Sequence, residues 1–264
     1  MLKAVLHAHS TYSDGEFTLP EIKTLFSEEG CSVVCMTDHA ESFDETKLAE
    51  YVRECAALSD EQFLFICGLE YECEQRMHIL GYGTAALAGT TDPQKVIRHI
   101  EEHGGVAVIA HPKDTMFGWI ESFDVLPSGI ETWNSKYDGR YAPRPATFDL
   151  LLRLRHRRPG MNAFYGQDLH WKKQFRGLFT QLECNSLTRD AVLGALSAGA
   201  YSGLKGELRL PSSGELPVEL AARFAAQHAK SDRIRNFLKA GKKSIDSLGI
   251  TVPASIKAQL RRIF

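Results

Sequence analysis

The sequence has no long hydrophobic run and almost no net charge. Its apolar stretches stay well short of the roughly 18 residues that a membrane-spanning helix needs, and the apolar start at residues 1–6 is too short for a signal peptide. The formal net charge of the 264 residues is −2 with histidine neutral, which is typical of an ordinary soluble protein. These features predict a cytoplasmic protein that makes no membrane contact.

Cysteine pairs and internal repeats are also missing. The six cysteines are scattered without a Cys-x-x-Cys pair, mostly in apolar surroundings: Cys31, Cys35, Cys55, Cys67, Cys73 and Cys184. This distribution argues against a zinc finger or a disulfide framework and indicates buried, reduced thiols. No repeat or low-complexity tract is visible, so a repeat architecture is not expected.

The composition of the chain is that of a globular protein, with 44% hydrophobic, 24% charged and 9% aromatic residues. It supplies a large core and argues against disorder, collagen and coiled coil. The length suits either one α/β barrel or two small domains.

Short apolar runs alternate with helical patterns over the first two hundred residues. Thr18 and Glu21 form a capping-box pattern before one helix, and Asp92-Pro93 opens another that stops near Gly104. The runs predicted as strands are 3–6, 33–36, 63–67, 106–110, 129–131, 161–165 and 178–184. Because helices between strands imply parallel pairing and a barrel exposes no sheet edge, we expect a mainly parallel, closed or nearly closed α/β barrel.

A stretch rich in proline, serine and glycine at 210–217 precedes a different kind of segment. From Glu219 to Phe264 there are ten lysines and arginines against three acidic residues, and Pro253 suits a first helical position. We therefore predict a barrel over residues 1–210 and a basic helical extension over residues 211–264 that packs on it. The alternative for the basic face is a patch that attracts an anionic substrate or nucleic acid.

Histidines and carboxylates stand at or just after the apolar runs. His7 and His9 end the first predicted strand on one face, because strand residues two apart point to the same side. Later runs and one turn deliver further groups: Asp14, His39, Glu70, His78, His111, Asp168 and His170. Any one of these residues is more often structural, and a single HxH pair is weak evidence.

Nine such groups at one strand edge indicate a metal site. Clustered carboxylates repel one another and buried histidines lose hydration, so burying them together without a partner is costly. Divalent cations neutralise the charge and use the donor atoms. The sequence therefore predicts bound divalent metal ions, with Mn, Fe or Zn as the candidates.

The order of these motifs resembles that of the PHP family, the polymerase and histidinol phosphatase superfamily. The motifs are His7-x-His9, Ser13-Asp14-Gly15, Thr37-Asp38-His39, Gly68-Leu69-Glu70, His78, His111-Pro112 and Asp168-x-His170. The resemblance spans residue 1 to about residue 205. It implies a distorted (β/α)7 TIM-like barrel with a trinuclear metal site, to which the basic extension is a C-terminal helical appendage.

The resemblance also implies how the three ions are held. The ligand sets are His7, His9, Glu70 and Asp168 for one ion, Asp14, His39 and His170 for a second, and Glu70, His78 and His111 for a third. Asp14 stands where many relatives have histidine, and this hard anionic donor favours Mn²⁺ or Fe²⁺ over Zn²⁺. Asp38 is expected to accept a hydrogen bond from a neighbouring imidazole.

Such a site suits the hydrolysis of phosphate esters, because paired cations lower the pKa of a bridging water and offset charge on the attacking and leaving oxygens. We expect a metal-dependent phosphoric ester hydrolase in which a metal-bridging hydroxide attacks phosphorus in line. The ligands other than His78 and His111 are predicted to be catalytic. The predicted substrates are small phosphomonoesters, such as a nucleoside monophosphate or a sugar or amino-alcohol phosphate. The sequence has neither a Cys-x5-Arg loop nor a GxxxxGK[ST] loop, so those phosphate-binding chemistries are not supported.

Residues in or near the loop after the fifth predicted strand suit substrate binding. Arginine and lysine bind non-reacting phosphate oxygens, and aromatic rings stack on a base or a sugar. The candidates are Arg144, Arg140, Lys113, Lys136, Trp133 and Tyr137. The alternative is a loop anchored by its aromatic residues, with its cations in solvent.

Two other functions stay open. One is a phosphodiesterase or exonuclease that trims short oligonucleotides, which the basic extension and the aromatic loop favour. The other is a non-catalytic, metal-stabilised interaction module, which the complete ligand set disfavours. An amidohydrolase deaminase also begins with an HxH pair, but the two carboxylates and the Asp168-x-His170 motif fit it poorly.

Overall fold

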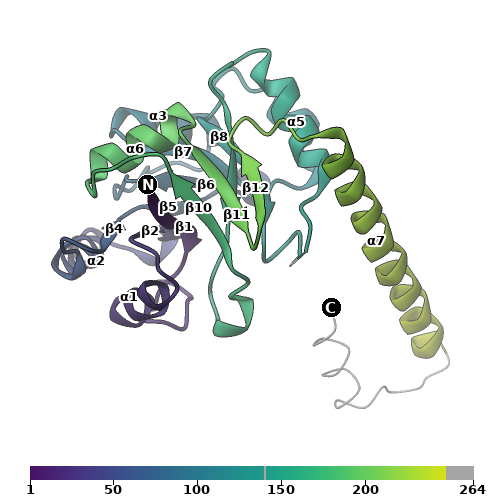
Figure 1. Ribbon diagram of the computed structural model, residues 1–264, viewed down its shortest axis with the longest axis horizontal. Coiled ribbons are helices and arrows are strands. Elements are labelled where there is room, and N and C mark those ends of the chain that lie inside the picture. The colour runs from purple at the N-terminus through teal and green to yellow at the C-terminus, as the bar shows by residue number, and fades with distance from the viewer. Residues whose placement is uncertain (140, 248–264) are drawn as a thin grey trace.

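The computed structural model describes residues 1–139 and 141–247 and shows alternating strands and helices (Figure 1). The strands are β1 (Leu2–Ala8), β2 (Val33–Met36), β3 (Asp38–His39), β4 (Leu64–Ile66), β5 (Leu69–Cys73), β6 (Met77–Tyr82), β7 (Val106–Ala110), β8 (Gly129–Asn134), β9 (Asn162–Gly166), β10 (Leu178–Leu182), β11 (Tyr201–Lys205) and β12 (Leu208–Pro211). The helices are α1 (Leu19–Glu28), α2 (Glu45–Leu58), α3 (Pro93–Glu102), α4 (Phe117–Glu121), α5 (Pro145–Arg155), α6 (Arg189–Ala198) and α7 (Val218–Ser247). The predicted α/β class is confirmed.

The strands of the described residues form two six-stranded sheets and not one mainly parallel barrel. Their orders are β12-β11-β10-β1-β2-β4 and β3-β5-β6-β7-β8-β9. β1 is parallel to β2 but antiparallel to β10, and β6 is antiparallel to both of its neighbours. The expectation of seven parallel strands is corrected accordingly, because β5–β6 and β11–β12 are hairpins without a helical crossover.

The two sheets are joined where β9 ends beside β1. The backbone N–H of Gln167 donates to the carbonyl of Leu6 at 3.0 Å, and that of His9 donates to the carbonyl of Leu169 at 2.9 Å. A parallel bridge also links Ala8 with Leu169. The chain after β9 is thereby fixed next to the end of β1, although the two are far apart in the sequence.

Both helix starts predicted from the sequence are confirmed. The Thr18 hydroxyl accepts from the backbone N–H of Glu21, and the Glu21 carboxylate accepts from the backbone N–H of Thr18 at 2.8 Å, which completes the capping box of α1. Asp92 accepts from the first backbone N–H groups of α3. That helix buries Val96, Ile97 and Ile100 against the sheet, as their helical spacing predicts.

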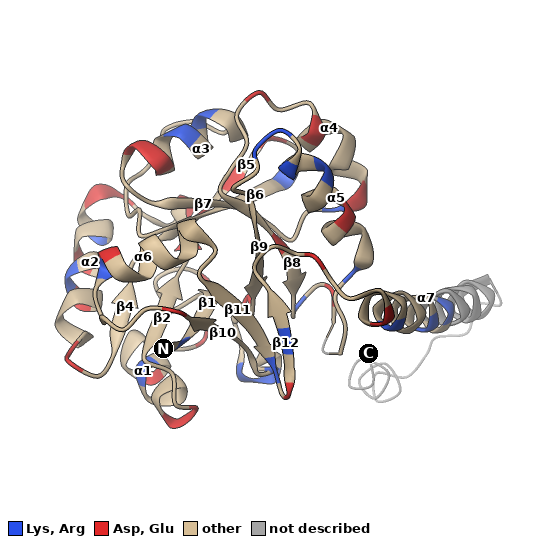
Figure 2. Cartoon of the chain, turned by 45° about the horizontal axis from the view of Figure 1, so that its top comes forward, with Lys and Arg blue, Asp and Glu red and all other residues tan. Residues whose placement is uncertain are grey.

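The outside of the fold carries acidic and basic residues interspersed over the helices (Figure 2). Four of the cysteines are buried thiols, and Cys67 and Cys184 are partly exposed; none forms a disulfide in the described residues. No helix of the described residues is long and apolar enough to cross a membrane.

α7 packs on the rest of the chain through its first turns. Phe224 is buried, and its ring centre lies 6.2 Å from that of Trp133. Farther along, the helix leaves the body of the fold (Figure 1). The division after residue 210 and the packing of the whole basic extension stay predictions, and Pro253 lies outside the described residues.

Candidate metal centre

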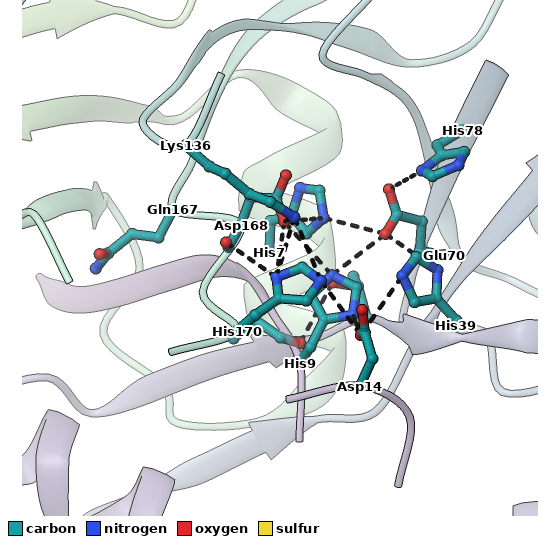
Figure 3. Close-up of polar contacts among 12 residues, drawn as sticks. His7, His9, Asp14, His39, Glu70, His78, Lys136, Gln167, Asp168 and His170 are labelled. Atoms are coloured by element: carbon teal, nitrogen blue, oxygen red, sulfur yellow. Dashed lines mark hydrogen bonds and ion pairs between the residues drawn. The ribbon is translucent and has the colours of Figure 1, made fainter. Parts of the chain in front are cut away.

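The nine predicted ligands come from separate elements and meet at one place, and all of them except His111 are labelled in Figure 3. β1 and the turn after it supply His7, His9 and Asp14, and β3, β5 and β6 supply His39, Glu70 and His78. His111 follows β7, and Asp168 and His170 follow β9. Because β9 ends beside β1, Asp168 and His170 lie against His7, His9 and Asp14.

Glu70 is the carboxylate around which the imidazoles gather. It is buried, and its Oε1 lies 2.8 Å from His78 Nδ1 and 3.2 Å from His111 Nε2. Its Oε2 lies 3.2 Å from His9 Nε2, 3.4 Å from His7 Nε2 and 3.5 Å from His39 Nδ1. Five imidazoles thus face one carboxylate.

Asp14 is the centre of a second, more exposed group. Its Oδ1 lies 3.2 Å from His170 Nε2, 3.6 Å from His39 Nε2 and 3.7 Å from His9 Nδ1. The rings of His9 and His170 are stacked with their centres 4.0 Å apart. Since Asp14 is half exposed, this end of the cluster opens to solvent.

The donor atoms fit divalent cations. Within four groups of residues, the possible ligand atoms all lie within 4.8 Å of one another: His9–Asp14–His39–His170, His7–His9–Asp168, His7–Glu70–His111 and His39–Glu70–His78. Three of the buried nitrogens, His7 Nε2 and both ring nitrogens of His9, have no hydrogen-bond partner. Buried polar atoms without partners are costly, and bound cations would use them as ligands.

Burial and charge act against each other on these groups. Burial disfavours a charged imidazole, but Glu131, Asp168 and Glu70 outweigh it and raise the pKa of His7 well above its usual range. At His9 burial prevails over the contact with Glu70 and lowers the pKa to about 4. Burial disfavours charge on Glu70 and Asp168 as well, yet the neighbouring imidazoles, with His7 foremost, hold the pKa of both carboxyls well below the usual range. Both carboxyls therefore stay ionised, as metal ligands must be.

Three of the clustered residues have a left-handed backbone. The φ angles are 62° at His7, 28° at His111 and 52° at Asp168. A residue other than glycine in this region costs about 1–3 kcal/mol, and such residues concentrate at functional sites. The fold accepts this cost at three positions where a side chain turns into the cluster.

The chain matches the model of a known protein family. The family model described as "PHP domain" matches residues 6–210. The chain belongs to the PHP family. The resemblance seen in the motif order is thereby confirmed. Among curated proteins, no match was found.

Solved structures share the fold of this PHP domain. A two-domain protein from Bacteroides vulgatus, described as containing a predicted PHP-like metal-dependent phosphoesterase, is 16% identical with a TM-score of 0.55, over 79% of this chain and 66% of its own. PsfC from Pseudomonas syringae is 15% identical with a TM-score of 0.51, over 87% and 98%. The lesion-specific endonuclease EndoQ of Pyrococcus furiosus is 16% identical with a TM-score of 0.52, over 76% and 57%.

The contacts of Asp38 differ from the expected hydrogen bond with an imidazole. Asp38 does not meet an imidazole among the described residues. Its carboxylate accepts from the backbone N–H of Ser10 at 2.8 Å, from the Ser10 hydroxyl at 2.9 Å and from the Ser13 hydroxyl at 2.6 Å. Asp38 thus fixes the turn between His9 and Asp14 instead of a histidine ring.

Of the predicted substrate-binding residues, Lys136 and Tyr137 lie at the cluster. Lys136 Nζ is 3.0 Å from Asp168 Oδ1 and 3.3 Å from His170 Nδ1. The Tyr137 side chain is 54% exposed, and its ring centre lies 4.5 Å from that of His111. A cation and an exposed ring therefore border the site.

The other four candidates lie differently. Trp133 cannot stack on a substrate, because it is completely buried and its indole N–H donates to the carbonyl of Gly139 at 3.0 Å. Arg144 is bound to the protein itself, through Asp138 at 2.5 Å, Asp114 at 2.7 Å and the carbonyl of Pro112 at 2.7 Å. Lys113 is exposed, and Arg140 lies outside the described residues. The prediction of Trp133 as a substrate contact is corrected by its burial, whereas the role of Arg144 at the substrate stays a prediction.

Arg144→Met should destabilise the protein by about 3 kcal/mol, because the substitution leaves the buried Asp138 carboxylate without its cation. Urea unfolding measures the loss. The double variant Arg144→Met with Asp138→Asn should recover part of it, whereas Arg153→Met removes a half-exposed pair and should cost less than about 1 kcal/mol. An unchanged stability with weakened phosphate binding would instead return Arg144 to the role expected from the sequence.

Sequence reasoning missed three residues at the site. Glu131 and Asn134 are completely buried polar residues that contact His7 and Asp168, respectively. The signal was present, because an acidic residue inside an apolar strand must have a partner. Trp171, 39% exposed, directly follows His170, and its ring centre lies 5.6 Å from that of His170.

Proposed function

We propose that this PHP domain is a metal-dependent phosphoesterase that hydrolyses small phosphomonoesters. The observation that carries the proposal is the gathering of five imidazoles on the buried Glu70, with buried ring nitrogens of His7 and His9 that have no hydrogen-bond partner. When bound, divalent cations lower the pKa of a water and offset the charge that develops on phosphate oxygens. That chemistry suits a phosphate ester.

We propose three ions, in the ligand sets that the family resemblance implies. Asp14, His39 and His170 would hold one, and His9 also has a possible ligand atom within 4.8 Å of theirs. His7, His9, Glu70 and Asp168 would hold the second, and Glu70 with His78 and His111 the third. The carboxylate of Asp14 favours Mn²⁺ or Fe²⁺ over Zn²⁺ at the open end.

The residues of the chain itself would orient the substrate. Lys136, held by Asp168, offers a positive charge to non-reacting phosphate oxygens at the rim of the cluster. Tyr137 offers an exposed ring beside His111 for the organic part of the substrate. Glu70 and Asp168 are buried among imidazoles, and bound cations would offset the negative charge that these carboxylates otherwise present to the phosphate.

A second candidate function is a phosphodiesterase on short oligonucleotides. The observation that favours it is a pair of exposed rings beside the cluster, each with a lysine near its face. Lys136 Nζ lies 5.1 Å from the ring centre of Tyr137, and Lys173 Nζ lies 5.1 Å from that of Trp171. Rings and cations in this arrangement suit stacked bases and a phosphate backbone.

Metal removal and two model substrates test these proposals. After treatment with a chelator the protein should not hydrolyse 4-nitrophenyl phosphate, and added Mn²⁺ should restore the activity. The bis(4-nitrophenyl) phosphate diester should react more slowly than the monoester under the same conditions. Metal content is measured in the same samples, so that occupancy and turnover are compared directly.

Other results of these assays would support a different function or contradict the proposal. Faster hydrolysis of the diester, with an affinity for oligonucleotide that falls steeply with salt, would favour the phosphodiesterase. Full metal occupancy without turnover of either ester would contradict both enzymes and favour an interaction module. A protein that binds no divalent ion would contradict the whole proposal.

A further inference from the structure

The Glu131 carboxylate in β8 contacts two of the proposed ligands at once. Its Oε1 lies 2.8 Å from His7 Nδ1. Its Oε2 accepts from the backbone N–H of His111 at 2.9 Å and from the side-chain amide of Asn134, also at 2.9 Å. Glu131 is completely buried, and it is not among the residues that could hold a metal ion in the described structure.

Asn134 extends this network to a third proposed ligand and to the loop that follows β8. Its Nδ2 lies 3.2 Å from Asp168 Oδ2 as well as 2.9 Å from Glu131. Its Oδ1 accepts from the backbone N–H groups of Lys136 at 3.0 Å and Tyr137 at 3.1 Å. The three proposed ligands reached by this network are His7, His111 and Asp168, the same three that have a left-handed backbone.

The neighbouring strand leaves room for the carboxylate. A Cβ atom on Gly166 of β9 would lie 1.7 Å from Glu131 Oε1 and 3.1 Å from His7 Cβ. No side chain fits at residue 166 while Glu131 and His7 keep their positions. The contact between Glu131 and His7 therefore depends on a glycine of a second strand.

We propose that Glu131 is a positioning residue that sets the His7 tautomer and, with Asn134, holds His111 and Asp168 in place. The inference rests on the proposed metal site. In the neutral imidazole, Glu131 accepts the proton of His7 Nδ1 and leaves His7 Nε2, a buried atom without a hydrogen-bond partner that lies 3.4 Å from Glu70 Oε2, free to bind a cation.

The amide variant Glu131→Gln should reverse this arrangement without changing the size of the side chain. The Oε2 position faces two donors, the His111 backbone N–H and the Asn134 amide, so the oxygen of glutamine must face them. The NH₂ group of glutamine then faces His7 Nδ1 and donates to it. The proton of His7 is forced onto Nε2, the atom that should bind the cation.

Mn²⁺ titration of the full chain by calorimetry tests the inference. Glu131→Gln should weaken the affinity of at least one Mn²⁺ by about 10- to 100-fold. Thr132→Val is the matched control, because Thr132 is buried in the same strand and its hydroxyl contacts the carbonyl of Phe164 at 3.4 Å and the Tyr165 side chain, neither of which is a proposed ligand. Thr132→Val should keep the wild-type affinity.

A second measurement does not depend on the folding of a variant. In the Zn²⁺-loaded wild-type protein labelled with ¹⁵N-histidine, NMR spectra should show the proton of His7 on Nδ1. A proton on Nε2 would overturn the inference.

The outcomes separate this inference from the proposed function. An affinity of Glu131→Gln within twofold of wild type, or an equal loss in Thr132→Val, would overturn the role of Glu131. A wild-type protein that binds no Mn²⁺ would instead overturn the proposed metal site on which the inference rests.

Discussion

Glu70→Gln should reduce turnover of a phosphate ester by at least about a thousandfold, because it removes several kcal/mol of electrostatic stabilisation from the proposed ions. The carboxylate of Glu70 faces five imidazoles, which is more than any other acidic side chain of the described residues faces. The amide of glutamine keeps the shape but loses the charge and half of the acceptor atoms. Turnover of 4-nitrophenyl phosphate with saturating Mn²⁺ measures the loss.

Glu74→Gln provides the matched control, because Glu74 is exposed in the turn between β5 and β6. Its activity should equal that of the wild type. Metal content should fall in Glu70→Gln but not in Glu74→Gln. Wild-type turnover in Glu70→Gln would mean that the cluster around Glu70 is not where the reaction takes place.

Trp133→Ala should destabilise the protein by about 3–5 kcal/mol, the usual cost of removing a large buried aromatic side chain. Trp133 has no exposed surface, contacts the Phe224 ring of α7 and donates a hydrogen bond to Gly139. The free energy of unfolding in urea measures the effect.

Tyr137→Ala gives the opposite expectation at a residue just after β8. The side chain is mostly exposed, so the free energy of unfolding should change by less than about 0.5 kcal/mol. If the ring contacts substrate, KM should rise instead. A stable Trp133→Ala protein with a raised KM would restore the stacking role that the sequence suggested for Trp133.

The sequence predicted the ligands better than the sheet that carries them. Strands such as β2 and β7 match the predicted runs, because continuous apolar residues leave little choice of structure. β5 and β6 were missed since each is interrupted by charged or polar residues that belong to the site, Glu70 and His78 among them. Without β6, the antiparallel pairing in this sheet was not predictable.

Contacts between distant segments explain the other differences. Trp133 lies in a segment that looks like an aromatic loop, and only the packing of α7 shows that it belongs to the core. Arg144 resembles a free phosphate-binding cation until Asp138 and Asp114 are seen beside it. Glu131 stands in a predicted strand, but its partner His7 is more than a hundred residues away. Of these pairings, Arg144 with Asp138 spans only six residues, whereas the others join segments that no local pattern connects.

The left-handed backbone at His7, His111 and Asp168 limits how this centre can be transplanted. A designer who copied the donor side chains onto an ideal barrel would place them on regular strands, where they point elsewhere. The left-handed backbone conformations, and the glycine at position 166 that leaves room for Glu131, would have to be copied too. In this protein, the geometry of the cluster depends on the conformation of the backbone as much as on the identity of the donor side chains.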